Sequence, residues 1–219
     1  MPRVATADDS SAPADDVLVA SARAGDLDAF NRLVERYERL VFAVCYRLLR
    51  DAHQAEDVTQ DAFIKAYLAI ADYRGGSFRS WLLHIATNRA YDVLRYQRRH
   101  AARSLDAEPV EREADWTVEP APDDPHDTAD RRELQARLEA ALGQLPEDQR
   151  LVVVLHDVYG YHYEEIAAIT EVALGTVRSR LSRGRARLRQ ILREDPGTRE
   201  LFDEAGRQTA SGDAAGLEG

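Results

Sequence analysis

Apolar side chains recur at three- and four-residue steps through the first hundred residues, and this spacing predicts amphipathic α-helices. The breaks between them carry aspartate, serine or paired glycines, which are the residue types that cap helices or form turns. The first predicted helix runs from Asp15 or Asp16, either of which can cap it, to Gly25-Asp26, and the second runs from Phe30 to Leu48 before a break at 51–53. The third runs from Val58 to Ile70. After a loop at 73–77, the fourth runs from a cap at Ser77 or Ser80 to the basic residues 95–99.

Helical spacing returns after residue 130 and ends in a helix-turn-helix pattern. A leucine stripe marks one helix, and Pro146 begins another that continues to Gly160. The valines at 152–154 favour a strand locally, but their helical neighbours and the lack of a partner strand predict a helix. A short helix at 163–169 and a long one from Leu174 to Leu192 follow.

Residues 101–130 interrupt the helical pattern with four prolines and, from residue 106 onward, ten carboxylates. This composition predicts an extended acidic linker. Residues 1–14 and 194–219 are rich in small and polar residues and are predicted to be tails. We therefore predict an all-α fold of two small helical domains, residues 15–100 and 131–193, joined by an acidic flexible linker.

Composition excludes several classes of protein. No apolar run approaches the ~20 residues that a membrane-spanning helix needs, and Met1 to Ser11 does not resemble a secretory signal. The single cysteine, Cys45, cannot form a disulfide within the chain and is too few for a zinc site. These observations predict a cytoplasmic protein without membrane insertion.

The net charge of −10 argues against nucleic-acid binding, but the charges are segregated. Residues 178–193 hold seven arginines and no acid. The repulsion among these positive charges indicates that the segment binds a polyanion such as nucleic acid. The alternative is an ordinary charged helix face exposed to solvent. In the long second helix of the pattern, Arg178, Ser179, Ser182 and Arg183 share the face that reaches base edges in the major groove. Arg180, Arg185, Arg187 and Arg189 are better placed for phosphates.

A second positive patch comprises Arg89, Arg95, Arg98, Arg99 and Arg103, with aromatic residues interleaved. Basic surfaces with aromatic platforms suit single-stranded DNA, because unpaired bases can stack on the rings. We expect Tyr73 and Phe78 to be exposed beside Gly75-Gly76, while Trp81 is either core or a stacking platform.

Five motifs occur in order between residues 51 and 181. They are Asp51-x4-Glu56-Asp57-x2-Gln60-Asp61-x-Phe63, Phe78-Arg79-Ser80-Trp81-Leu82-x2-Ile85-Ala86-x-Asn88, Leu145-Pro146-x3-Arg150, Tyr163-x-Glu165-Ile166-Ala167 and Gly175-Thr176-Val177-Arg178-Ser179-Arg180-Leu181. Each motif alone is weak. The ordered set, interrupted by a linker, resembles the extracytoplasmic-function (ECF) sigma factors, a compact branch of the bacterial sigma family, over residues 15–192.

The resemblance implies a non-enzymatic factor that binds core RNA polymerase and promoter DNA. The first domain would dock on polymerase through Asp57, Gln60 and Asp61. It would also melt the −10 element, with single-stranded DNA near Tyr73, Phe78, Trp81, Asn88, Arg89, Asp92 and Arg95. The second would read the duplex −35 element through Arg178, Ser179, Arg180, Ser182, Arg183 and Arg185. The linker would enter the RNA-exit path, although a solvated spacer fits it too, and an anti-sigma partner is typical of the family.

Two positions depart from the family pattern. Glu171 stands where glycine is frequent, and Ala173 stands where a capping serine or proline is frequent, so Thr170 or Glu171 is expected to help begin the recognition helix.

No other chemistry is indicated. The nearest histidine cluster, His126, His156, Asp157 and His162, lacks a metal-binding spacing, and we find no nucleophile motif, phosphate loop or cofactor site. Two alternatives remain open at this point. One is a DNA-binding regulator with an unrelated helical sensor domain, and the other is an interaction protein whose basic helix binds an acidic partner.

Overall fold

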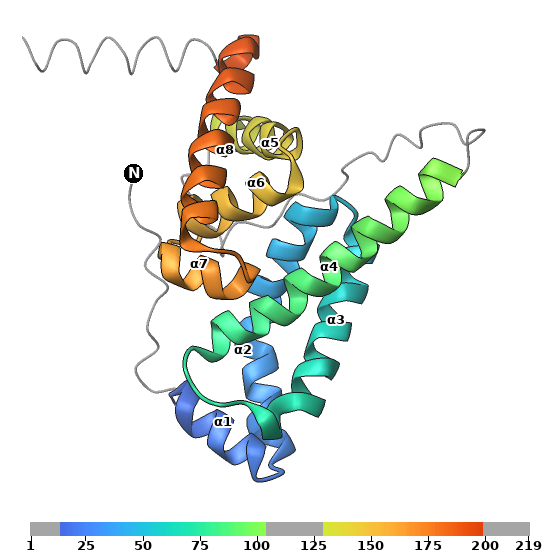
Figure 1. Ribbon diagram of the computed structural model, residues 1–219, viewed down its shortest axis with the longest axis vertical. Helices are drawn as coiled ribbons and strands as arrows, with labels where there is room; N and C mark the ends of the chain where they lie inside the picture. Colours follow the sequence, from blue (N-terminus) through green and yellow to red (C-terminus); the bar gives the residue numbers. More distant parts are fainter. Residues whose placement is uncertain (1–13, 104–128, 199–219) are drawn as a thin grey trace, which may run out of the picture.

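The computed structural model describes residues 14–103 and 129–198, which fold into two packed helical lobes (Figure 1). The first lobe contains α1 (Asp15–Arg23), α2 (Leu27–Leu49), α3 (Ala52–Ala69), the 3-10 turn η1 (Ile70–Asp72) and α4 (Phe78–Arg103). The second contains α5 (Ala129–Gly143), α6 (Glu147–Val153), the π-helical turn η2 (Val154–Val158), α7 (Tyr163–Thr170) and α8 (Leu174–Glu194). No strand occurs among these described residues, so the all-α prediction is confirmed, including the helical valines 152–154.

Three of the predicted breaks carry a capping side chain. In each, Asp26, Asp51 or Ser77 accepts a hydrogen bond from the backbone amide three residues further on, at 3.0–3.2 Å. Such bonds satisfy amide groups that have no partner inside the helix. Of the two serines considered for α4, Ser77 is therefore the cap.

The prediction that Asp15 or Asp16 caps α1 is wrong. The helix begins at Asp15, after Ala14, and no side chain caps it. Asp15 instead reaches α2, where it accepts hydrogen bonds from Arg36, at 2.6 Å, and from the hydroxyl of Tyr37. The carboxylate of Asp15 is bound by side chains of another helix and so does not cap its own. Rules based on neighbouring residues cannot predict such a tertiary contact.

Two helices reach slightly into the predicted linker. α4 continues past residue 100 to Arg103, and α5 begins at Ala129. The rest of the linker, residues 104–128, lies outside the described residues, as do residues 1–13 and 199–219. At the other end, α8 ends at Glu194 and the described chain continues to Thr198.

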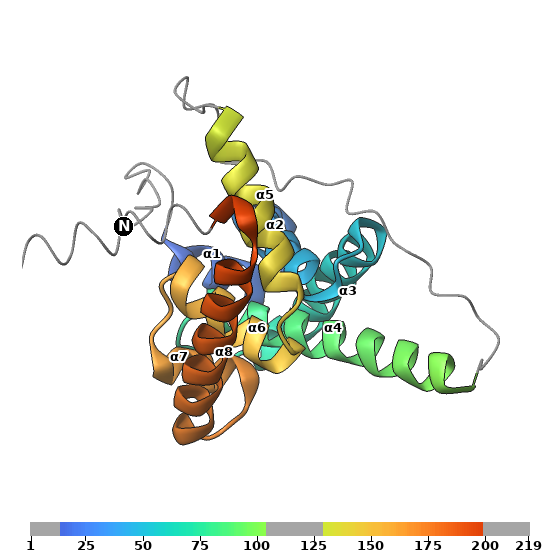
Figure 2. The same cartoon turned by 90° about the horizontal axis from the view of Figure 1, so that it is seen from above.

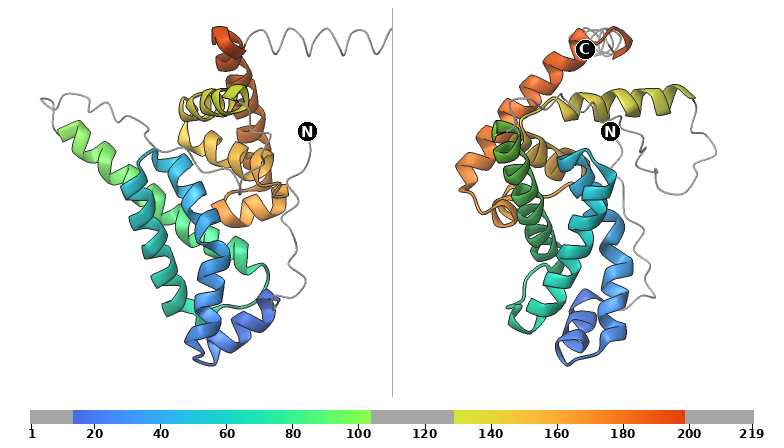
Figure 3. Two further views of the ribbon diagram at one scale, coloured as in Figure 1. Left: turned by 180° about the vertical axis from the view of Figure 1, so that it is seen from behind. Right: turned by 90° about the vertical axis from the view of Figure 1, so that its right-hand side faces the viewer.

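The two lobes share one contiguous apolar core, and α7 lies beside α4 where they meet (Figure 3). Polar contacts reinforce this junction. Arg47 of α2, whose side chain is 9% exposed, donates to Glu139 of α5 at 2.7 Å and to the hydroxyl of Tyr159 at 2.7 Å. The guanidinium of Arg79 lies 4.5 Å from the centre of the Tyr161 ring. The lobes are therefore joined by specific contacts.

Arg150 is the most buried charged residue of this junction, at 7% exposure. Its guanidinium donates to the carbonyl oxygens of Arg47 and Leu48 at the end of α2, of Gly143 at the end of α5, and of Leu145 in the turn that follows, at 2.9–3.1 Å. Carbonyl groups at helix ends lack amide partners and carry partial negative charge, so a buried cation is favourable there. Burial nevertheless lowers the pKa of Arg150 to about 10. One side chain thus ties α2 to the second lobe.

Candidate nucleic-acid interface

α7 and α8 form the predicted helix-turn-helix, with an unusual turn. Glu171 adopts the left-handed conformation, with φ 52°, which glycine adopts more readily. Ala173 precedes α8, and no side chain caps the helix. Thr170 does not help, because its hydroxyl donates to the carbonyl of Ile166 at 2.6 Å. The expected helper cap is therefore absent, yet α8 begins at Leu174 as predicted.

α8 is buried along one face and exposed along the other. Val177 and Leu181 are buried against the lobe. The guanidinium of Arg183 donates to the carbonyl and the hydroxyl of Ser179, both at 3.2 Å, which lays it along the outer surface. The exposed residues include those predicted to reach base edges: Arg178, Ser179, Ser182 and Arg183.

Gly184 allows α8 to lie very close to α6. A Cβ atom at this position would lie 2.7 Å from Cγ2 of Val153 and 3.3 Å from Gln149. Sequence reasoning did not single out Gly184, although a glycine in the middle of a helix is a usable signal for close packing. The glycine therefore fixes how α8 sits on α6.

Two arginines of α8 have acidic partners from the same lobe. Arg180 pairs with Asp148 of α6 at 3.0 Å, and Arg185 pairs with Asp157 of η2 at 3.0 Å. The expectation that these arginines lack acidic partners is wrong for these two, because folding brings carboxylates from α6 and η2 beside them. Within the described part of the chain, four others make no ion pair with an acid: Arg178, Arg183, Arg187 and Arg189.

The expectation that Tyr73 and Phe78 are exposed is also wrong. They are only 7% and 2% exposed, and the hydroxyl of Tyr73 donates to the carbonyl of Gly76 at 2.6 Å. Both rings lie within 6.0 Å of each other and of the partly exposed Trp81. Burying these aromatic rings stabilises the fold more than leaving them exposed to solvent would. The aromatic cluster therefore supports the glycine loop from inside, and Trp81 retains partial access to solvent.

The polar face of α4 lies next to the second lobe. Asn88, Asp92 and Arg95 share a face because they are separated by four and three residues. Asn88 contacts His84, whose Nδ1 lies 3.0 Å from the carbonyl oxygen of Ile169 in α7. A cleft of about 600 Å³, lined in part by Asn88 and Arg95, separates α4 from the start of α6. Beside this face, Arg89 pairs with Asp61 of α3 at 2.8 Å.

α3 presents a mixed acidic and apolar stripe. Asp57 and Gln60 are exposed, and Asp61 is partly exposed. Two side chains that the sequence analysis did not single out continue the stripe: Ile64 and Leu68, at 59% and 75% exposure. The spacing of 57, 61, 64 and 68 places these residues on one helical face. The sequence could have predicted this stripe, because residues three and four positions apart also share the exposed face of a helix.

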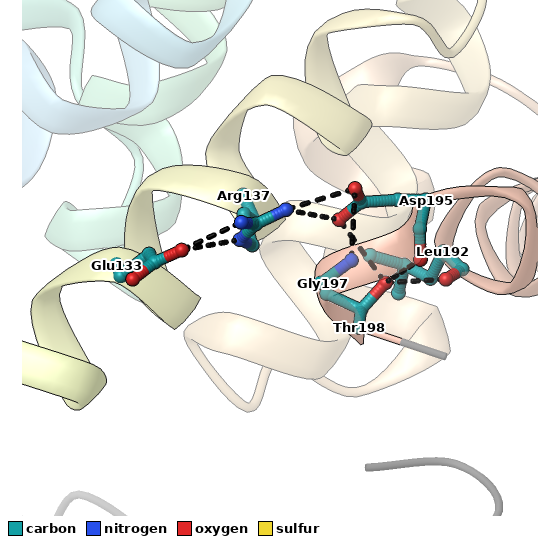
Figure 4. Close-up of polar contacts among 6 residues, drawn as sticks. All are labelled: Glu133, Arg137, Leu192, Asp195, Gly197 and Thr198. Atoms are coloured by element: carbon teal, nitrogen blue, oxygen red, sulfur yellow. Dashed lines mark hydrogen bonds and ion pairs between the residues drawn. The ribbon is translucent and has the colours of Figure 1, made fainter. Parts of the chain in front are cut away.

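A polar clasp fixes the end of α8 to α5 (Figure 4). Arg137 donates to Glu133 at 2.6 Å on its own helix and to Asp195 at 2.9 Å after α8. Thr198, which is buried, donates to the carbonyl of Leu192 and closes the last turn. The clasp sets the direction of α8, whose length Figure 2 shows from above.

Other kinds of site are not indicated in the described ranges. Residues 14–103 and 129–198 contain no group of three or more possible metal ligands, and none of their helices is long and apolar enough to cross a membrane. Cys45 is fully buried, and burial raises the pKa of its thiol to about 12, so it is unreactive at neutral pH.

Comparisons of sequence place the chain in a family. The family model for sigma-70 region 2 matches residues 33–100, and that for sigma-70 region 4 matches residues 135–188. The chain is 37% identical to RNA polymerase sigma-H factor of Pseudomonas aeruginosa over 81% of its own length and 93% of the relative's. It is 39% identical to ECF RNA polymerase sigma-E factor of Escherichia coli K12 over 78% of its own length and 90% of the relative's. A third relative, ECF sigma factor SigE of Mycolicibacterium smegmatis, is 38% identical, and the match spans 62% of that protein.

Solved structures agree. CnrH, solved in complex with the cytosolic domain of CnrY, superposes with a TM-score of 0.61 and 28% identity, over 84% of this chain and 99% of that one. The sigma factor RpoE of Bartonella quintana, solved with the anti-sigma factor NepR, superposes with a TM-score of 0.60 and 29% identity. That match covers 76% of this chain and 98% of the other. The chain therefore belongs to the ECF group of the sigma-70 family of bacterial RNA polymerase. It is a non-enzymatic factor that directs promoter-specific transcription initiation, and the alternative regulator with an unrelated sensor domain is excluded.

Proposed function

We propose that three surfaces of this sigma factor divide the work of initiation. The outer face of α8 reads the −35 duplex, the polar face of α4 holds the single strand of the −10 element, and the stripe on α3 docks on core polymerase. The single observation that carries the proposal is the outer face of α8, where serines and arginines that have no acidic partner among the described residues stand exposed opposite a buried seam. A recognition helix needs this division.

On α8, Arg183 is the strongest candidate for reading a base. Its guanidinium is held along the helix by Ser179, so less conformational freedom is lost when it pairs bidentately with guanine. Arg178, Ser179 and Ser182 complete the base-reading face. Arg180, Arg185, Arg187 and Arg189 serve phosphates, and the first two exchange an acidic partner for DNA.

On α4, Asn88, Arg89, Asp92 and Arg95 line the path of the separated strand. Trp81 is the candidate platform for a base, because it is the member of the aromatic cluster that keeps partial access to solvent. Tyr73 and Phe78 act from below by shaping the glycine loop.

On α3, Asp57, Gln60 and Asp61 supply charge and polarity, while Ile64 and Leu68 supply apolar area. An exposed apolar side chain beside complementary charges is the usual composition of a protein interface. The docking surface therefore extends about two helical turns beyond the motif residues.

The closed arrangement of the lobes must open on a promoter. Elements centred near −35 and −10 are separated by about 25 base pairs, which is about 85 Å of duplex at 3.4 Å per base pair. α7 of the DNA-reading lobe here contacts α4 of the melting lobe. Both elements can be bound together only if this junction separates.

Several further assignments follow from the family. We infer a cytoplasmic location, where polymerase and chromosome are found. The sigma factor RpoE of Bartonella quintana was solved with the anti-sigma factor NepR, and we propose a comparable partner for this chain. The linker at 101–130, whose ten carboxylates resemble the charge of nascent RNA, is proposed to enter the RNA-exit path; most of it lies outside the described residues.

The test is transcription in vitro with purified full-length protein, core polymerase from a related bacterium and a fragmented genomic library. We expect transcript starts that share two motifs, one near −35 and one near −10. Absence of initiation by folded protein, with a polymerase that is active with another sigma factor, would contradict the proposed division of work.

Replacing Arg183 by alanine is expected to relax base preference at one or two −35 positions, with a loss of about 1–3 kcal/mol of discrimination. The matched control is Arg187→Ala, which should weaken binding to all promoters alike because a phosphate contact carries no sequence information. Both are measured by sequencing starts from a randomised −35 library. Identical base preferences in Arg183→Ala and wild type would remove Arg183 from the reading face.

A further inference from the structure

Three of the four arginines between residues 89 and 99 of α4 are already paired with carboxylates. The pairs are Arg89 with Asp61, Arg95 with Asp92, and Arg98 with Glu147. Arginine binds carboxylate and phosphate through the same planar donors. The chain's own acids therefore occupy the places that phosphates of a single strand would take.

The three carboxylates come from different parts of the fold. Asp92 lies on α4 itself and moves with Arg95. Asp61 lies on α3, in the stripe proposed to dock on polymerase, with 2.8 Å between its Oδ2 and Nε of Arg89. Glu147 is the first residue of α6 in the other lobe, and it meets Arg98 across the cleft between α4 and α6.

We propose that Asp61 and Glu147 are removable covers over two arginines that bind the single strand: Arg89, which lines the proposed strand path, and Arg98, which extends that path along α4. The inference rests on the proposed function, in which Asp61 docks on polymerase and the lobes separate along the promoter. Docking draws the carboxylate of Asp61 toward a basic group of polymerase, and separation carries Glu147 away from α4. Each event frees one arginine, so the strand-binding surface gains its positive charge only in the assembled complex.

The exposure of the two pairs suits exchange. The side chains are 36% and 42% exposed for Arg89 and Asp61, and 64% and 23% exposed for Arg98 and Glu147. Ion pairs that reach solvent are weak, so a new partner can replace the old one at little cost. Arg47, at 9% exposure, makes the contrasting kind of pair, which holds the lobes rather than covering a surface.

The base-reading arginines of α8 carry no such cover, although the phosphate-binding Arg180 and Arg185 are paired with Asp148 and Asp157. On α8, Arg178 and Arg183 are exposed and make no ion pair with an acid within the described residues. The arginines proposed to read bases are therefore available before assembly, whereas Arg89 and Arg98 are not.

The experiment removes the covers without polymerase. Full-length Asp61→Asn, Glu147→Gln and the double variant are titrated at low ionic strength with a fluorescent mixed-sequence single-stranded 12-mer. We expect about threefold tighter binding for each single variant and about tenfold for the double variant. Each freed arginine should steepen the plot of log K against log salt by about 0.7.

Controls separate uncovering from a general change of charge. Glu35→Gln with Glu38→Gln removes two exposed acids from α2 and should leave binding within about twofold of wild type. Adding Arg89→Ala and Arg98→Ala to the double variant should abolish its gain. The proposal is overturned if the double variant matches the control, or if its gain survives loss of both arginines.

Failure of the underlying function has a different readout. If holoenzyme with Arg89→Ala and Arg98→Ala opens promoters as well as wild type, measured by permanganate reactivity of unpaired thymines, α4 does not hold the strand. That result would overturn the proposed −10 surface whatever the free protein binds.

Discussion

Asp61→Arg is expected to weaken binding of core RNA polymerase by at least about a hundredfold, because a like charge replaces a complementary one at the docking stripe. The substitution also sets the new guanidinium beside Arg89, which lies 2.8 Å from the present carboxylate. The side chain is 42% exposed, so the helix itself should be unaffected. The measurement is fluorescence anisotropy of labelled protein titrated with sigma-free core polymerase, with circular dichroism to verify the fold.

Matched variants separate docking from the loss of the ion pair. Asp61→Arg combined with Arg89→Glu restores an ion pair between α3 and α4 but not the docking charge, so it should still bind polymerase poorly. Glu35→Arg, an equal change of charge on exposed α2, should bind normally. Leu68→Glu tests the apolar extension of the stripe and should also weaken binding. Normal affinity in Asp61→Arg would exclude α3 as the docking surface.

The second large effect is on stability. Arg150→Leu is expected to lower the free energy of unfolding by about 3–5 kcal/mol, because it removes a buried cation and leaves carbonyl oxygens at two helix ends without donors. Since the four carbonyls belong to both lobes, the loss should also loosen the junction. Urea unfolding followed by circular dichroism measures the first effect, and small-angle scattering measures the second.

Two substitutions calibrate that result. Arg150→Lys keeps the charge but cannot span four carbonyls with one planar group, so an intermediate loss is expected. Arg137→Leu removes an arginine of α5 from the clasp with Asp195, where the side chain is 34% exposed, and should destabilise the fold far less than Arg150→Leu. If Arg150→Leu costs as little as Arg137→Leu, Arg150 does not hold the lobes together.

Local rules in the sequence were sufficient for the helices and most of their ends. Ser77, one of the two serines predicted to cap α4, does so, and Asp26 and Asp51 cap helices at predicted breaks, because a capping bond joins residues only three positions apart. The exposed face of α8 was also predictable, since helical periodicity alone separates Arg183 from Leu181. The family followed from five motifs in a fixed order, which require no knowledge of packing.

The sequence by itself therefore determined the helices, the helix-turn-helix and the family. The tertiary structure alone decided the rest, because it depends on contacts between distant residues. Asp15 bonds to α2 instead of capping α1, and Tyr73 and Phe78 turn inward because the other helices offer them a core. The carboxylate beside Arg89 lies 28 residues away along the chain, and that of Arg98 lies in the other lobe. The charge environment and the burial of these side chains depend on which surfaces pack together on folding. Local sequence patterns do not specify that packing.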